Sequence, residues 1–133
     1  MRALKTRALS CLITAALLLT LLPGAVSAAG KTIYTNMSYT GVSDGSISKP
    51  YASFEDAVRN AGDGDTIVIQ GKAFANAREE SGVSPLVIDK SVTITGEDGK
   101  TGVLHVRAGG IILGADVTMT NVELNLANKY HNA

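Results

Sequence analysis

The chain has no tryptophan, two phenylalanines and a single cysteine among its 133 residues. With one cysteine it cannot form an internal disulfide, so an apolar core and backbone hydrogen bonds must hold its fold. The scarcity of aromatic residues leaves only a thin platform for stacking against ligands. Lys and Arg together number 12, as do Asp and Glu, so the chain lacks the basic excess that is typical of nucleic-acid-binding domains.

Only one long apolar run is present, and it lies at the N-terminus. Arg2, Lys5 and Arg7 precede an apolar run over residues 9–22, and small residues follow at Val26-Ser27-Ala28. Fourteen helical residues span about 21 Å, which is short of the ~30 Å hydrocarbon core of a bilayer. The pattern therefore predicts a secretory signal peptide and not a transmembrane anchor.

Removal of residues 1–28 as a leader would take away Cys11 and three basic residues. The remaining chain would carry 9 basic and 12 acidic residues, a net charge of −3, and no cysteine. We expect one domain of about 105 residues. We expect it to be secreted or displayed at the cell surface, with no membrane span and no nucleic-acid partner.

Short apolar runs recur in the chain with a spacing of 25 residues. Alternate residues of a strand share one face, so each run is expected to point two side chains into a core. These pairs are Ile67 with Ile69, Val92 with Ile94, and Val117 with Met119. A second set, Leu86-Val87-Ile88 and Ile111-Ile112-Leu113, repeats at the same distance. Such a period predicts stacked units that bury their apolar faces only against one another.

Each run is followed by a residue that tolerates a left-handed backbone. These residues are Gly71, Gly96 and Asn121, and we expect all three to form corners between strands. Each unit holds about three short strands and lacks the helix of leucine-rich or ankyrin repeats. The sequence therefore predicts an all-β solenoid of parallel strands, stacked ~4.8 Å apart.

A different pattern precedes the repeats. A short strand is expected over residues 31–35, a polar loop over 36–50, and a helix over Ser53–Ala61. Ser53 can cap the helix, and Gly62 is expected to stop it. The apolar stripe of the helix consists of Phe54, Ala57, Val58 and Ala61. With one apolar face, the helix is expected to lie over the first unit of strands.

Other parts of the chain are less regular. Residues 72–85 are expected to form a polar, irregular connection with a short helical turn near Ala75–Glu80. Further strands are expected over Val103–Val106 and Val122–Leu126. Residues 128–133 read as a connection toward a further strand, which predicts that the 133 residues are the leading part of a longer protein.

Several features, in order along the chain, carry a resemblance to a known family. They are the early strand at Thr32, the turn Lys49-Pro50-Tyr51, the helix from Ser53 and the entry Gly64-Asp65-Thr66-Ile67. This order resembles the amino-terminal cap of right-handed parallel β-helix proteins, the pectin-lyase-like superfamily. The resemblance implies a right-handed single-stranded parallel β-helix with an N-terminal capping α-helix. The cap would occupy residues 29–65, and the first coils would occupy residues 66–133.

The resemblance implies a fold and leaves the activity open, because this fold carries lyases, hydrolases, esterases and adhesins. One hypothesis is the N-terminal part of a secreted or cell-surface protein with a structural, adhesion or polysaccharide-binding role. Its partner would be an extracellular polysaccharide or a cell-surface ligand. The alternative is the N-terminal part of a polysaccharide lyase or glycoside hydrolase whose catalytic coils lie beyond Ala133. No catalytic residue is identified in the chain. The first hypothesis is favoured, because the sequence shows no acid cluster and no aromatic residues that would line a groove.

Two acidic turns are candidates for a calcium site. Asp63 and Asp65, with Asp44 earlier in the chain, could supply carboxylate oxygens. The turn Glu97-Asp98-Gly99-Lys100 could do the same. Ordinary turn chemistry explains both segments better, so no cofactor is expected, with calcium as the one candidate.

Catalytic candidates are sparse. Glycoside hydrolysis needs two carboxylates ~5–9.5 Å apart, and only Asp89, Asp116 and Glu123 lie on or beside the expected strands. The repeat brings no two of them to one position. His105 has no nucleophile or orienting acid at a recognisable spacing and is expected to face solvent. Arg107 could pair with an acidic sugar, but a plain surface charge is favoured.

The remaining candidates concern surfaces. Tyrosines at 34, 39, 51 and 130 could stack against sugars, and Tyr51 is expected to pack in the cap. Asn36-Met37-Ser38 fits an N-glycosylation acceptor. The last coil, over Val117–Leu126, is expected to be uncovered, so self-association through this edge is predicted.

Overall fold

The computed structural model describes residues 29–75, 84–107 and 109–126. Within these ranges it contains one helix and nine strands. The elements are β1 (Thr32–Thr35), α2 (Phe54–Asn60), β2 (Thr66–Ile69), β3 (Lys72–Ala75), β4 (Leu86–Ile88), β5 (Val92–Gly96), β6 (Gly102–Val106), β7 (Ile111–Leu113), β8 (Val117–Thr120) and β9 (Val122–Leu126). The predicted signal peptide at 1–28, the helical turn beyond Ala75 and the connection at 128–133 lie outside the described residues.

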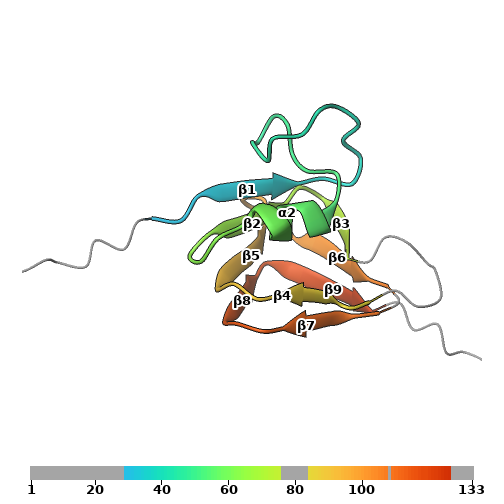
Figure 1. Cartoon of the computed structure of the whole chain (residues 1–133). Helices are drawn as coiled ribbons and strands as arrows, with labels where there is room; N and C mark the ends of the chain where they lie inside the picture. The colour runs from blue at the N-terminus through green and yellow to red at the C-terminus, as the bar shows by residue number, and fades with distance from the viewer. Residues whose placement is uncertain (1–28, 76–83, 108, 127–133) are drawn as a thin grey trace, which may run out of the picture.

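The strands form three parallel sheets that the chain visits in a fixed order. The first sheet has the order β1-β2-β5-β8, the second β3-β6-β9 and the third β4-β7, and every pairing is parallel. We call β2, β3 and β4 the first repeat, β5, β6 and β7 the second, and β8 and β9 the third. In Figure 1 the strands of the first sheet follow one another downward from β1 through β2 and β5 to β8, and α2 lies at the height of β2 and β3. The prediction of a β-rich fold with parallel strands is confirmed.

One apolar row runs through the first sheet and forms the centre of the core. Ile33 pairs with Ile67, Ile67 with Ile94, and Ile94 with Met119. The three isoleucines are buried, and Met119 packs against them half-exposed. Burial of one such side chain contributes about 1.5–3 kcal/mol. The core cluster also takes residues from the other two sheets and from α2, so all three sheets face one shared interior.

The 25-residue spacing holds for part of the chain only. Val92 pairs with Val117 and Leu86 with Ile111, as the period predicts. The prediction that Ile67 and Val92 are equivalent is wrong, because Ile67 pairs with Ile94, an offset of 27. Connections between strands differ in length, and the alternation along a strand tolerates any shift by an even number. The side chains of Ile67 and Ile94 therefore still point into the core, as the sequence predicts.

The corner residues are predicted correctly at two of three positions. Gly71 has φ 80° and Asn121 has φ 52°, both in the left-handed region. The prediction for Gly96 is wrong, because Gly96 ends β5, pairs with Ile69 and is buried. A Cβ at this residue would meet the main chain of Lys100, Gly102 and Asn121. Gly96 is thus required by close backbone packing, and Gly99, with φ 72°, makes the left-handed turn.

The helix begins as the sequence predicts and ends differently. Ser53 is the N-cap, and its hydroxyl accepts the N–H of Asp56 at 3.3 Å. The apolar stripe is fully buried, with α2 contacting β1 and β3. The helix ends at Asn60, one residue before the predicted end, and Ala61 is an extended C-cap. Gly62 follows the helix as predicted but is not among the residues with a left-handed backbone. Its N–H donates to Asp65 Oδ2 at 2.7 Å, which fixes the chain as it leaves the helix.

A strand forms where the sequence predicts an irregular segment. β3 occupies Lys72–Ala75, the first residues of the segment expected to be polar and irregular. Ala73 and Ala75 are completely buried opposite Leu104 and Val106. Alanine has a low strand propensity, so the alternation in this segment is weak as a local signal. Pairing with β6 and burial of the two alanines place this strand, and these are contacts between segments far apart in the chain.

Candidate functional site

A notch lies on the outer face of the first sheet, among the residues that the structure describes. It arises because the connections at the C-terminal end of this sheet differ in length. A long loop over residues 36–50 follows β1, two residues join β2 to β3, and residues 97–101 join β5 to β6. The short connection lies between two longer ones, so the surface is hollowed there over about 370 Å³.

The floor of the notch comes from side chains that alternate outward along the strands. Tyr34, Val68 and Thr95 are in register on β1, β2 and β5 and form this floor. Ile47 forms one wall and belongs to the loop over residues 36–50, which we call the upper loop. The opposite wall consists of Glu97, Asp98 and Lys100, which belong to the loop over residues 97–101, the lower loop. One side of the notch is therefore apolar and aromatic, and the other is charged.

Local hydrogen bonds hold both walls in place. The side-chain amide of Gln70 donates to the carbonyl of Ile47 at 3.2 Å, and the N–H of Tyr34 donates to the carbonyl of Gly45 at 2.8 Å. In the lower loop, the N–H of Lys100 donates to the carbonyl of Glu97 at 2.8 Å. The ammonium of Lys100 also lies 3.0 Å from a carboxylate oxygen of Glu97. The notch is thus bounded by two loops with defined conformations.

Asp63 and Asp65, the calcium candidates, bind main-chain N–H groups. Oδ1 of Asp63 accepts the N–H of Ser91 at 2.8 Å. Oδ1 of Asp65 accepts the N–H of Lys31 at 2.9 Å, and its Oδ2 accepts that of Gly62. The two carboxylates therefore connect different segments of the chain. Within the described ranges, no group of three or more His, Cys, Asp or Glu residues is placed to hold a metal ion.

The other acidic candidates are separated by the fold. Asp89 follows β4 of the third sheet, Glu123 lies in β9 of the second sheet, and Asp116 precedes β8 of the first. Each of them is exposed. The structure therefore does not gather these three residues on one sheet. Asp44 lies in the upper loop, where its Oδ1 accepts the N–H of Ser46 at 2.9 Å. Hydrogen bonds from the Ser46 side chain and main chain hold the pKa of Asp44 below its ordinary value.

His105 lies on the outer face of the second sheet and contacts an aromatic neighbour. It pairs with Phe74 on β3, and the two rings stack with centroids 4.8 Å apart and planes 21° apart. The guanidinium carbon of Arg107 lies 4.4 Å from the centre of the Phe74 ring, close enough for a cation–π contact. This cluster was not predicted from the sequence, because β3, which positions Phe74, was expected to be irregular. The cluster packs against itself, so the faces of its rings are partly occupied.

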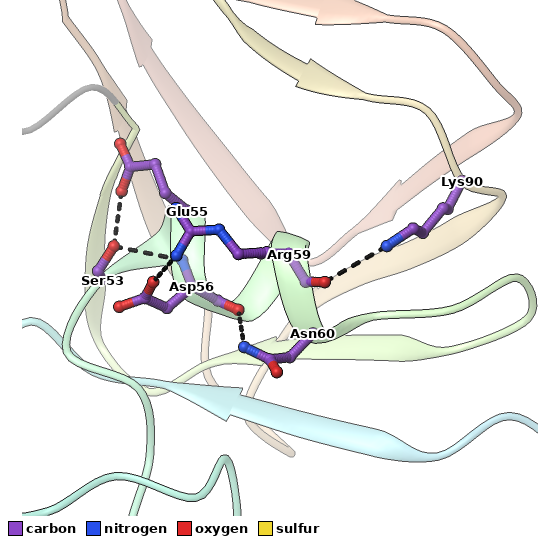
Figure 2. A network of polar contacts seen from close by, with 6 residues as sticks. All are labelled: Ser53, Glu55, Asp56, Arg59, Asn60 and Lys90. Atoms are coloured by element: carbon purple, nitrogen blue, oxygen red, sulfur yellow. Dashed lines mark hydrogen bonds and ion pairs between the residues drawn. The ribbon is translucent and has the colours of Figure 1, made fainter.

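A second groove, of about 440 Å³, lies between α2 and β4. Figure 2 shows the polar residues that line the exposed side of α2. Arg59 pairs with Asp56 at 2.7 Å, the Ser53 hydroxyl donates to Glu55 at 2.9 Å, and Lys90 donates to the carbonyl of Arg59 at 3.4 Å. Arg59 and Asp56 form an ion pair, whereas Glu55 and Lys90 bind a hydroxyl and a carbonyl, and the pattern is that of a solvated helix face. We therefore place the candidate site in the notch.

The tyrosines have different surroundings. Tyr51 packs against the core, as predicted, and its main chain forms a parallel bridge with Thr35. Tyr39 lies in the upper loop, where its hydroxyl approaches the carbonyl of Val42 at 3.4 Å. Tyr34 is the one of these three that lines the notch. Tyr130 lies outside the described residues.

Comparisons with known proteins identify no relative. The chain matches no protein-family model, and searches of curated proteins and of solved structures find no match either. Among the helices that the structure describes, none has the length and apolarity to cross a membrane. The function must therefore be argued from the fold and the notch.

Proposed function

We propose that the chain is the N-terminal cap and the first coils of a secreted or cell-surface right-handed parallel β-helix with a structural, adhesion or polysaccharide-binding role. The supporting observation is the cyclic order of the strands, in which β2, β5 and β8 return to one sheet and β3, β6 and β9 to another. Stacked repeats of this kind bury a continuous core and present long, regular outer faces. Such faces suit an extended extracellular ligand.

The position of α2 supports the role of a cap. The helix contacts β1 and β3, which are the first strands of their sheets, and places its buried stripe against them. Exposed sheet edges pair readily with other chains, and solenoids need covered ends for solubility. In this proposal α2 keeps the N-terminal end of the β-helix closed.

Secretion is part of the same proposal. Expression of the whole chain in a secreting host should release a product that begins at Ala29, because the residues before it have small side chains suitable for cleavage. Sequencing of the N-terminus would test this. A product that retains the apolar run and stays with the membrane would contradict it.

Co-sedimentation with insoluble cell-wall polysaccharides would test the binding role. We expect the chain to sediment with at least one polysaccharide and to generate no ultraviolet-absorbing unsaturated product from polygalacturonate, with or without calcium. Measurable turnover would contradict the binding role, and it would also contradict the alternative, in which the catalytic coils lie beyond Ala133. Failure to sediment with any polysaccharide would overturn polysaccharide binding.

A further inference from the structure

We propose that the notch between residues 36–50 and 97–101 binds one unit of a neutral glycan and rejects acidic sugars. This inference rests on the proposed polysaccharide-binding role and adds a location and a specificity to it. The first supporting observation is the shape of the notch, a concavity of about 370 Å³ on the outer face of the first sheet. A volume of this size lies at the lower end of the range of small-molecule sites.

The two sides of the notch match the two kinds of surface on a sugar ring. Tyr34, Ile47 and Val68 form an apolar side, against which the C–H groups of a pyranose can pack. Thr95, Glu97 and Asp98 offer hydroxyl and carboxylate oxygens on the other side. Sugar hydroxyls both donate and accept hydrogen bonds, and carboxylate oxygens are strong acceptors for them.

The charge of the notch argues for a neutral ligand. Two carboxylates, those of Glu97 and Asp98, face one ammonium, that of Lys100. Lys100 lies 3.0 Å from Glu97, so its charge is offset locally. The carboxylate of a uronic acid would then meet the negative charge of Asp98 without an equivalent cation. A neutral sugar would suffer no such repulsion.

The notch is also held in shape before any ligand arrives. Ile47 is tied to Gln70 through its carbonyl, and the lower loop is closed by the hydrogen bond from Lys100 to Glu97. Walls that are already ordered lose little conformational entropy on binding. A shallow site with few contacts can therefore still bind, with a Kd of about 0.1–1 mM for a short oligosaccharide.

Nuclear magnetic resonance titration of the secreted chain would test the inference. The probes are hexaoses of xylose, glucose and mannose as neutral ligands, and trigalacturonate as the acidic one. At low salt we expect at least one hexaose to shift the amide signals of Thr95, Gly96 and Asp98. Trigalacturonate should have a Kd at least about fivefold higher than that hexaose, and added salt should reduce the ratio of the two Kd values, because it screens the repulsion by Asp98.

Two variants test whether the glycan binds in the notch or elsewhere on the surface. Ile47→Ala and Asp98→Asn change exposed residues and should leave the unfolding midpoint unchanged. We expect Ile47→Ala to weaken hexaose binding about three- to tenfold. Asp98→Asn should strengthen trigalacturonate binding, because it removes the opposing charge. The matched control is Thr118→Ala, an exposed residue on the outer face of the same sheet and outside the notch, which should change neither affinity.

The outcomes distinguish this inference from the proposed function. Sedimentation with a polysaccharide, together with unchanged binding in both notch variants, would overturn the notch and leave the binding role intact. Tighter binding of trigalacturonate than of every hexaose would overturn the specificity. Absence of binding to any polysaccharide or probe would overturn both the notch and the polysaccharide-binding role.

Discussion

The main-chain N–H of Lys31 donates a hydrogen bond of 2.9 Å to Oδ1 of Asp65, which joins residues 34 positions apart in the sequence. Asp65 is 6% exposed, and its other oxygen accepts the N–H of Gly62. The main-chain carbonyl of Asp65 accepts the N–H of Thr93 from the next repeat. One residue therefore connects β1, the exit of α2 and the second repeat at the entry to β2.

Replacement of Asp65 by alanine should destabilise the chain more than any surface substitution. The change removes a buried carboxylate and leaves the partly buried N–H groups of Lys31 and Gly62 without their acceptor, and we expect the free energy of unfolding to fall by about 2–3 kcal/mol. Asp65→Asn keeps one acceptor oxygen and should cost about half as much. Urea unfolding followed by circular dichroism measures both effects. Asp98→Ala, at an exposed turn, is the control, and an equal loss in Asp65→Ala and Asp98→Ala would contradict the role of Asp65.

Gly71 and Gly96 should respond differently to the same substitution. Gly71 has φ 80°, and no described atom lies within 4 Å of the point that a Cβ would occupy. Gly71→Asn should therefore cost less than about 1 kcal/mol, because Asn tolerates this backbone. Gly96→Asn forces a side chain against three main-chain atoms, and overpacking of this kind costs about 3 kcal/mol. Chemical unfolding of the two variants compares them directly. A larger loss for Gly71→Asn would show that the close packing around Gly96 can relax.

The pH dependence of the upper loop should depend on Asp44. The two hydrogen bonds from Ser46 stabilise the charged carboxylate, so the pKa of Asp44 in the folded chain is depressed. Its contribution to loop stability is therefore present above the ordinary pKa of Asp and is lost as the pH falls through the depressed value. Carbon-13 titration of the Asp44 carboxyl should give a midpoint below that of an unstructured peptide. Ser46→Ala removes the hydroxyl and keeps the main-chain N–H, so it should raise the midpoint in part, and an unchanged value would rule out the Ser46 hydroxyl as a cause.

The last repeat should mediate self-association of the chain over residues 29–133. Leu124 pairs with Leu104 on the inward side of β9, yet it remains 47% exposed because β9 is the last described strand of its sheet. Leu124→Lys should lower the sedimentation coefficient at micromolar concentration. Asn125→Lys, one residue along on the outward face, is the matched control and should leave it unchanged. A monomer at all concentrations for the unmodified chain would contradict the prediction.

Much of the strand pattern could be predicted from local sequence. The alternation at Ile67, Ile94 and Met119 determines which side chains face the core, because side chains on a strand have a period of two. The N-cap Ser53 and the buried stripe of α2 are equally local. The register between β2 and β5 cannot be predicted from local sequence, because it depends on the lengths of the loops between them.

The notch could not be predicted as a unit from its residues. Tyr34 and the turn from Glu97 to Lys100 were both candidates, for separate reasons, and Val68 and Thr95 were not. They come together because residues on adjacent parallel strands pair across gaps of about 27 to 34 positions. A signal was present in the chain, namely the contrast between a two-residue connection at 70–71 and longer loops before and after it.

The sequence by itself determined the repeat, the strand faces, the helix start and the left-handed corners at Gly71 and Asn121, because each depends on a few neighbouring residues. Only the tertiary structure decided the pairing of Ile67 with Ile94, the strand at Lys72–Ala75 and the burial of Gly96. These features depend on contacts between residues far apart in the chain. The roles of Asp63 and Asp65 belong to the same class, since their acceptor oxygens are used by main-chain donors that no local pattern identifies.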